Sequence, residues 1–554
     1  MSDPSTTFQR LILLAAAFAL PGCSVFYELS LDQCKVDADC TSIGQGMICG
    51  TDNICKLDDR GCGSNAQCID ENSTESVCVK EQPTSLRGQC VNLKTPECPQ
   101  LLPLEPQSYA SDVLRNSNPV VLGAFTNVTI SPFLLNFDLA MTEVHEKNDG
   151  LATSGGTRPL LMLACNGNRA SDVENFDQSL DTAMDHLLDL KVPGIASGLG
   201  ATDLKRVFET KGFPANVFFM SAQEADSAFP RQNNGLLWEL LPGGTSLARS
   251  YRPIIDRTLA FLQGSGALTG TARVAQVNTP DIRAMSDLAN GLLDDTTGLF
   301  FNGMTAVENV VAGNFLQRTT PSSSQDNTAD LSAQVDALLE FKPHVIISLG
   351  SREFLTRILP QVEQLWDTRV PDQPRPFYVL SPYQYGDRGA LNTMLSSNLA
   401  VRTRMLGVNA PAAEDVSVYN DYFARFTRYE LPNAGGYENF YDAAYYLLYA
   451  AAAARPLSDG LSMATGMGRL LSGMPFEVGP NDMTDAFQLL TTNPASTIQL
   501  IGAMGPPNFN TYGGRDDAGA VWCVAANNTV MPDVLKYNDA DGTMQGTFPC
   551  FPNY

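Results

Sequence analysis

The chain has 554 residues, of which 44% are hydrophobic and 17% charged, so it is long enough for two or three packed domains and too apolar to remain disordered. It contains 60 acidic and 36 basic residues, and the formal net charge of −24 repels phosphate backbones and anionic lipid surfaces. The composition therefore predicts a folded, multi-lobed protein with no nucleic-acid partner.

The N-terminus has the pattern of an export signal. A polar stretch, 2–10, precedes ten consecutive apolar residues, 11–20, which are too few to span a bilayer core of roughly 30 Å but suit a removable signal peptide. Leu-Pro-Gly-Cys at 20–23 resembles the lipobox of bacterial lipoproteins, so we expect cleavage before Cys23 and lipid attachment to its thiol. Because Ser24 follows, the resemblance favours the outer membrane, on its periplasmic or cell-surface side. The alternative is an ordinary secretory signal followed by a structural cysteine.

The cysteine distribution agrees with export. Nine of the 13 cysteines lie between Cys34 and Cys98, a density typical of oxidised, disulfide-stabilised segments. They form a rough internal repeat of four cysteines each, at 34, 40, 49, 55 and at 62, 68, 78, 90. The segment has no C-x2-C pair and no histidine, so we expect no metal. Outside the repeat, the simplest pairing is Cys98 with Cys165 and Cys523 with Cys550, although sequence alone does not fix connectivity.

After a polar segment, 99–118, which we interpret as a linker or a wrap-around segment, strand and helix patterns alternate to the end of the chain. Short apolar runs predict buried strands at 120–125, 160–164, 194–196, 216–220, 273–277, 315–318, 344–349 and 377–380. Amphipathic spacing predicts helices at 177–190, 202–210, 281–293, 331–341 and 353–365. The apolar run 441–454 is too short to span a membrane and is interrupted by Asp442, so we expect a buried helix there. This βαβ repetition predicts an α/β fold with parallel sheets.

The order of elements resembles the type I periplasmic-binding fold of branched-chain amino acid binding proteins and related receptor ligand-binding regions, over about 119–527. The likeness is carried by LLDLKVPGIASGLGATD at 187–203, FKPHVII at 341–347, the passage 415–450 with VYNDYFARFTRYE and ENFYDAAYYLLYAA, and a late hairpin pattern at 505–522. It implies two doubly wound parallel-sheet lobes joined by a three-crossing hinge that closes over a ligand. The expected division is a signal peptide at 1–22, a cysteine-rich disulfide module at 23–98, a linker at 99–118, lobe one at 119–248 and 409–497, lobe two at 249–408 and 498–535, and a C-terminal tail at 536–554.

Ligands of doubly wound sheets collect beyond the carboxyl ends of the strands, where helix N-termini direct N–H groups outward. After strand 194–196 the glycine-containing loop reaches Thr202, a candidate N-cap, and 221–224 has the spacing of a capping box. Tight turns with local caps are the alternative for both. The resemblance implies that these loops hold the carboxylate and amino group of the ligand. The candidate ligand-binding residues are Asn166, Ser197, Gly198, Thr202, Ser221, Gln223, Thr279, Ser351, Tyr383 and Tyr385.

Two further features bear on the ligand. Arg169 follows the loop that begins at Asn166, and it is either a partner for an acid or a solvated arginine. Tyr383 and Tyr385 follow strand 377–380, where aromatic rings could wall a small molecule. The family's amino acid binders place a carboxylate in this lobe to hold the ligand ammonium, and 381–385 contains no match for it.

Motifs of catalysis are missing from the sequence. It has no G-x-S-x-G, P-loop or H-E-x-x-H motif and only three histidines, so we expect no enzyme activity and no cofactor. The favoured function is capture of an amino-acid-like small molecule for ABC transport or sensing, with an ABC permease or a surface protein as partner and a lipid anchor in the membrane. The alternative is a scaffold lipoprotein that uses the same fold, without ligand, for protein–protein interaction.

Overall fold

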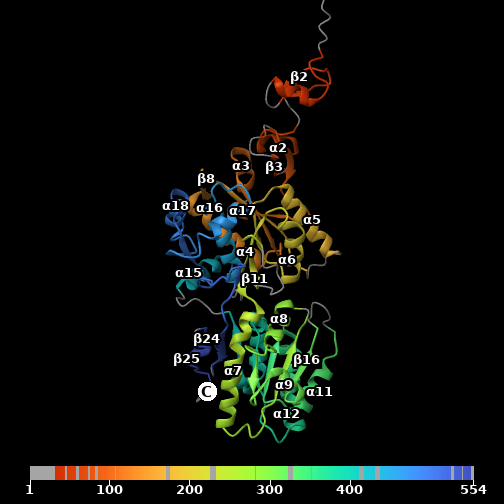
Figure 1. The fold of residues 1–554 in the computed structure, drawn as a ribbon, viewed down its shortest axis with the longest axis vertical. Helices are drawn as coiled ribbons and strands as arrows, with labels where there is room; N and C mark the ends of the chain where they lie inside the picture. Colours follow the sequence, from red (N-terminus) through yellow and green to blue (C-terminus); the bar gives the residue numbers. More distant parts are fainter. Residues whose placement is uncertain are drawn as a thin grey trace, which may run out of the picture. The chain divides into compact units, whose positions relative to one another are not determined.

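The structure is a computed structural model, shown in Figure 1, and it describes residues 32–43, 47–57, 61–72, 75–81, 85, 87–106, 108–169, 175–224, 233–280, 282–321, 328–350, 352–410, 417–430, 437–525, 529–539 and 541–550. The chain divides into two compact units. The first comprises Met1–Gly63 and Lys80–Gln89, and the second comprises Ser64–Val79 and Cys90–Tyr554. The predicted lipidation site, Cys23, lies outside the described residues.

The first unit is a small disulfide-bonded module. The 3-10 helix η2 (Asp37–Ser42) precedes two short antiparallel strands, β1 (Met47–Cys49) and β2 (Cys55–Leu57). Disulfides join Cys34 to Cys49 and Cys40 to Cys55, so the first cysteine pairs with the third and the second with the fourth. With so few apolar residues available, these bonds supply the stability that a larger core gives elsewhere.

The second half of the cysteine-rich segment is built into the second unit. It contains α2 (Asn65–Asn72), β3 (Ser76–Val79) and β4 (Gln89–Asn92). Ile69, Val77 and Leu93 belong to the same hydrophobic core as lobe one. Cys68 is bonded to Cys90, again second cysteine to fourth, which matches the repeat expected from the sequence.

The expected linker, 99–118, also has regular structure. It forms β5 (Gln100–Leu102) and α3 (Tyr109–Asn116), and β5 pairs antiparallel with β9 (Leu160–Asn166). The disulfide Cys98–Cys165, one of the two pairings suggested by the sequence, joins the same two segments. The segment is therefore an edge of the lobe-one sheet rather than a free linker, because its backbone N–H and C=O groups are paired there.

The lobe-one sheet has the order β22-β12-β11-β10-β6-β9-β5 and is parallel except for β5. Its further strands are β6 (Val120–Thr126), β10 (Gly194–Ser197), β11 (Phe218–Glu224), β12 (Leu237–Pro242) and β22 (Gly514–Arg515). The central strands are buried along their whole length, as expected of strands covered on both faces.

Helices cover both faces of this sheet. A Cβ on Gly123 would lie 3.1 Å from Leu187 of α5 (Phe176–Asp189), whereas one on Gly194 would lie 2.9 Å from Leu447 of α16 (Glu438–Ala453). Gly123 pairs with Ile195, so Gly123 and Gly194 point to opposite faces. Helix α16 is buried over nearly its whole surface, which confirms the buried helix expected at 441–454, and it lies beside α4 (Pro132–Asn148) although the two are far apart in sequence (Figure 1).

The remaining lobe-one elements are β7 (Leu151–Thr153), β8 (Gly156–Arg158), α6 (Ala201–Val207), the π-helical turn η3 (Phe208–Gly212), α15 (Ser417–Phe426), η6 (Thr427–Tyr429), α17 (Gly460–Met467), β20 (Met474–Glu477), α18 (Met483–Thr492) and β21 (Ile498–Ile501).

The lobe-two sheet has the order β16-β13-β17-β18-β19-β23-β24-β25. Its strands are β13 (Val274–Asn278), β16 (Phe315–Thr319), β17 (Val345–Leu349), β18 (Phe377–Leu380), β19 (Met405–Asn409), β23 (Ala520–Val524), β24 (Val530–Asn538) and β25 (Thr543–Gly546). The first five are parallel, and the last three are antiparallel additions.

The flanking elements of lobe two are α7 (Gly244–Gly264), α8 (Arg283–Gly291), β14 (Phe300–Phe301), β15 (Met304–Thr305), α9 (Ala306–Val311), α11 (Ser332–Phe341), η4 (Phe354–Ile358), α12 (Leu359–Arg369), α13 (Pro382–Gly386), α14 (Arg388–Ser397) and η5 (Leu399–Arg404).

The chain passes between the two sheets three times: between β12 and α7, after β19, and between β22 and β23. The third crossing differs from the expectation. The segment 498–515 stays with lobe one because β21 pairs with β20 and β22 pairs with β12. The hairpin expected at 505–522 is present as a short antiparallel bridge between Phe509 and Arg515, and the chain crosses to lobe two after it. The expected tail at 536–554 contributes β25 to the lobe-two sheet, and the second suggested disulfide, Cys523–Cys550, is present.

These sheets confirm the predicted α/β class with two doubly wound lobes. Among the helices that the structure describes, none combines the length and hydrophobicity that a membrane crossing requires.

Candidate functional site

Ser197 and Ser221 are paired neighbours in the lobe-one sheet, at the point where β10 ends and β11 continues to Glu224. Both side chains are fully buried. Ser197 Oγ accepts a hydrogen bond from Leu199 N at 3.3 Å, and Ser221 Oγ accepts one from Gln223 N at 3.1 Å. Each hydroxyl oxygen is therefore occupied by the backbone N–H two residues further along the chain.

Neither of the two helix caps expected from the sequence, at Thr202 and at 221–224, is present. The N-cap of α6 is Gly200, which makes no side-chain cap, and Thr202 is exposed in the first turn of the helix. No capping box forms at 221–224 because β11 continues through Glu224, paired with β12. Gln223 is consequently a strand residue, because sheet pairing outweighed the local capping signal.

Gly198 lies against an aromatic cluster that the sequence reasoning missed. A Cβ at this position would come within 2.5 Å of Phe440 Cε1, so the ring occupies the space beside the glycine. The centroid of Phe440 is 4.9 Å from that of Phe133, which is 4.6 Å from that of Tyr437. Phe133 starts α4 and Tyr437 precedes α16, and both rings are half-buried. Ser131 is the N-cap of α4, and Pro132 follows it. This helix-start signal, soon after β6, could have placed Phe133 at the candidate site from the sequence alone.

Asn166 is held by the cysteine-rich segment. Its backbone N–H donates to Glu97 O at 2.8 Å, and the preceding residue is bonded to Cys98. Its side-chain Oδ1 accepts from Asn168 N at 3.1 Å, which shapes the loop toward Arg169.

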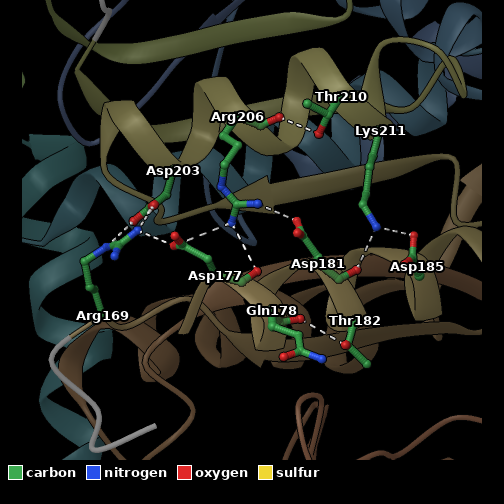
Figure 2. Close-up of polar contacts among 10 residues, drawn as sticks. All are labelled: Arg169, Asp177, Gln178, Asp181, Thr182, Asp185, Asp203, Arg206, Thr210 and Lys211. Atoms are coloured by element: carbon green, nitrogen blue, oxygen red, sulfur yellow. Dashed lines mark hydrogen bonds and ion pairs between the residues drawn. The ribbon is translucent and has the colours of Figure 1, made fainter. Parts of the chain in front are cut away.

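Arg169 joins two of the candidate loops, as Figure 2 shows. Its guanidinium forms a two-pronged ion pair with Asp203 of α6, with Nε 3.1 Å from Oδ2, and Nη2 also lies 2.7 Å from Asp177 Oδ1 of α5. These two carboxylates keep the pKa of Arg169 above its ordinary value. Arg169 is thus paired with acids of the chain itself, while its side chain is 57% exposed to solvent.

The same ion-pair system continues along the two elements. Asp181 and Asp185 follow Asp177 at helical spacing on α5 and pair with Arg206 and Lys211. In this ion-pair system three cations, Arg169, Arg206 and Lys211, thus face four carboxylates, those of Asp177, Asp181, Asp185 and Asp203. Asp177 is shared by two of the cations, because its Oδ1 lies 2.7 Å from Arg169 Nη2 and 3.8 Å from Arg206 Nη2.

In lobe two the candidates follow the ends of β13 and β18. Thr279 is buried, and its hydroxyl oxygen lies 3.3 Å from that of Thr320. Tyr383 on α13 is 37% exposed, which leaves its ring accessible, whereas the ring of Tyr385 packs against Trp522 with centroids 5.5 Å apart. Ser351 lies outside the described residues.

Beneath these tyrosines is a buried polar network. Gln384 Nε2 donates to Ser348 Oγ at 2.6 Å, and Ser381 Oγ donates to Gly350 O at 2.8 Å. Gln384 Oε1 accepts from Ser381 N, so α13 begins with a real capping box. The network fixes the start of α13 and leaves Tyr383 as the outward group.

The three histidines all have structural partners. His145 packs on Tyr109 with ring centroids 4.2 Å apart, and His186 Nε2 donates to Leu93 O at 2.8 Å. His344 Nδ1 accepts from Arg273 N at 3.0 Å, and burial lowers its pKa. Within the described ranges, the groups close enough to hold a metal are cysteines, and these are disulfide-bonded.

No protein-family model and no curated protein matches the chain. Among solved structures, a leucine binding protein from Thermotoga maritima is similar with a TM-score of 0.49 and 15% identity, covering 76% of this chain and 99% of that one. A solute binding protein of an ABC transporter from R. palustris, in complex with benzoate, has a TM-score of 0.48 and 8% identity over 78% of this chain and 99% of its own.

An ABC transporter substrate-binding protein from Desulfitobacterium hafniense in complex with Leu has a TM-score of 0.47 and 14% identity, over 77% of this chain and 99% of its own. Similarity at this level does not identify a ligand, which has to be argued from the chain's own residues.

Proposed function

We propose that this chain is an exported solute-binding protein that captures a small molecule between its two lobes, for ABC transport or for sensing. The observation that carries the proposal is the architecture: two doubly wound sheets, three chain crossings between them, and loops at the carboxyl ends of the strands in each lobe. Such strand ends are the usual ligand positions of open α/β sheets. Crossings of this kind are hinge segments, and closure over a ligand would place both sets of loops on it.

The proposed ligand contacts are the candidate residues above, Gly198 among them, with the aromatic rings beside Gly198 added. In lobe one, Ser197 and Ser221 set the loop backbones, while Phe133 and Tyr437 offer apolar surface. In lobe two, Tyr383 is the exposed ring. No group in this set is a nucleophile paired with a base, in keeping with binding rather than catalysis.

Export and anchoring form part of the same proposal. Twelve cysteines, from Cys34 to Cys550, are disulfide-bonded, which requires an oxidising compartment. The signal-peptide pattern ending at Cys23 supplies the route and, by its resemblance to a lipobox, a lipid anchor in the outer membrane. An ABC permease or a surface protein would be the partner.

A second candidate is a scaffold lipoprotein without a ligand. It is favoured by one observation: the cysteine-rich segment from Ser64 onward shares the core of lobe one, and its Glu97 and Cys98 hold the loop at Asn166. A loop clamped in this way is well suited to a fixed binding surface for another protein.

Thermal unfolding of the mature chain, from residue 24, against amino acids, short peptides, amides and small organic acids separates the two. A ligand present at 100 times its Kd adds about 2.7 kcal/mol to stability, which a melting curve resolves. A ligand that raises the midpoint supports the solute-binding function. If no compound shifts the midpoint, and natively purified protein carries no small molecule by mass spectrometry, the scaffold function replaces it.

A further inference from the structure

Helix α7 forms the floor of a cavity in lobe two that none of the candidate residues above lines. The cavity has a volume of about 340 Å³, which lies at the lower end of the roughly 300–1,000 Å³ typical of small-molecule sites. Arg249, Arg252, Pro253 and Asp256 line it from α7, and their spacings of three and four residues place them on one face of the helix. The cavity is therefore large enough for one small molecule.

Two segments form the walls of this cavity. One wall is the turn at 296–297, which follows α8. The other is the hairpin of β24 and β25, which contributes Tyr537 and Gly542 and lies beside α7 (Figure 1). A Cβ on Gly542 would lie 3.5 Å from Tyr537 Oη, so the hydroxyl reaches the turn of the hairpin.

Several charged groups around the cavity are used by the chain itself. Arg249 Nη1 donates to Asp539 Oδ1 at 2.8 Å, and Arg249 Nη2 donates to Asp516 Oδ1 at 2.9 Å. The carboxylates of Asp294 and Asp541 accept hydrogen bonds from threonines of their own turns. Arg249 thus faces two carboxylates already, and its role is to fasten the hairpin wall to α7.

Arg252 and Asp256 are the two charged lining groups that remain. Opposite charges four residues apart on a helix face usually pair, but Arg252 Nη1 instead donates to Thr296 O at 3.1 Å, and its guanidinium carbon lies 5.2 Å from the ring centroid of Phe300. Among the ion pairs of the described residues, none joins Arg252 to Asp256. Because a guanidinium has five N–H donors, Arg252 keeps donors for a carboxylate.

The acceptors of the cavity suit an ammonium group. The carboxylate of Asp256 is exposed and has no hydrogen-bond partner in the part of the chain that the structure describes. Pro253 has no N–H, so the carbonyl of Arg249 lacks its usual helical hydrogen bond. With the hydroxyl of Tyr537, the cavity supplies three kinds of acceptor, and an ammonium carries three N–H donors.

We propose that this cavity is a second small-molecule site, which binds a zwitterion that carries one ammonium and one carboxylate. The carboxylate binds the remaining N–H groups of Arg252, and the ammonium binds Asp256, the Arg249 carbonyl and the Tyr537 hydroxyl. The site goes beyond the solute-binding function, because its residues belong to α7 and to two segments of lobe two rather than to the loops at the strand ends.

The test titrates the mature chain, from residue 24, with glycine, β-alanine, 4-aminobutanoate and 5-aminopentanoate, which differ in the distance between their charges. Each is compared with the amine and the acid that keep only one of its charges, such as butylamine and butanoate for 4-aminobutanoate. Calorimetry measures each Kd and the number of sites. We expect at least one zwitterion to bind, with its amine and its acid each bound at least tenfold more weakly.

A matched pair of double variants locates the binding. R252M/D256N removes one charge of each sign from the cavity, and we expect the Kd of the zwitterion to rise at least tenfold. The control R369M/D336N removes an exposed pair, 3.2 Å apart, from α12 and α11, which pack on the opposite face of the same sheet. Its Kd should match that of the wild-type chain.

The single variant D256N, at an exposed position, should also weaken binding at least tenfold, and it provides the same test if the double variant does not fold. The proposal is overturned if no zwitterion binds, or if an amine or an acid binds as tightly as its zwitterion. It is also overturned if the cavity variants bind the zwitterion as the control does, since the molecule then binds elsewhere. In each of these cases the solute-binding function stands or falls separately, on the wider library of compounds.

Discussion

Replacing Arg425 with Met should strongly destabilise lobe one. Glu143 of α4 is 3% exposed, and its carboxylate is held by Arg425 Nε at 2.7 Å and by the hydroxyls of Tyr441 and Tyr445, both at 2.6 Å. Methionine keeps most of the apolar stem but removes the cation, so a buried charge is left with two neutral donors. Breaking a buried pair in this way costs about 3–5 kcal/mol, and the partial exposure of Arg425, 24%, favours the lower end, about 3 kcal/mol.

For a lobe of roughly 250 residues, this cost lowers the thermal midpoint by about 6–12 °C. The assay is thermal or urea unfolding of the mature chain, monitored by circular dichroism. The control is R428M, since Arg428 of η6 pairs with Glu146 of α4 at 3.4 Å, three residues beyond Arg425 and Glu143, with side chains 45% and 59% exposed. That surface pair should be worth about 0–1 kcal/mol.

A second variant separates the lost charge pair from lost packing. In E143Q/R425M the buried group is neutral, and we expect at least half of the lost stability to return. The reasoning is refuted if R425M and R428M shift the midpoint equally, or if the double variant is as unstable as R425M.

Three further outcomes are expected. Burial raises the pKa of Asp442 to about 7, and its carboxylate accepts N–H bonds from Ala503 and Met504. The native state then binds more protons than the unfolded state between pH 4 and 7, so the stability of wild type relative to D442N should fall by on the order of 4 kcal/mol over that range and stay level above it, as urea midpoints will show. Removing the disulfide between Cys523 and Cys550, which closes 27 residues, should cost about 3 kcal/mol in calorimetric unfolding. Gly198→Val should lower the midpoint by overpacking against Phe440, at a cost of about 1–3 kcal/mol, and should weaken any ligand found for the mature chain.

The strands of both lobes could be predicted because their signal is local. A run such as 160–164 is apolar at every position since both faces of β9 are covered, and the structure has the strand at Leu160–Asn166. The prediction for 216–220 was displaced, and the strand is Phe218–Glu224. Its polar second half, from Ser221, is held by pairing with β12, a neighbour that the residues themselves do not encode.

The sequence predicted that the cysteine-rich segment is stabilised by disulfides, but it did not predict how the segment is divided between the two units. Spacing gave the repeat of four, and the cysteines left outside it suggested Cys98–Cys165 as the simplest pairing, which is present. It could not show that the segment is divided at Gly63, because that boundary depends on which apolar side chains reach the lobe-one core. Ile69 and Val77 do so, and in sequence they are indistinguishable from the buried residues of a free-standing module.

The ion pair between Arg169 and Asp203 could not be predicted from the sequence for a related reason. Arg169 and Asp203 are separated by 34 positions and meet only because β9 and β10 end at the same edge of the sheet on either side of β6. A contact between two loops far apart in the sequence therefore decides which partners Arg169 has, and spacing along the chain does not show that contact.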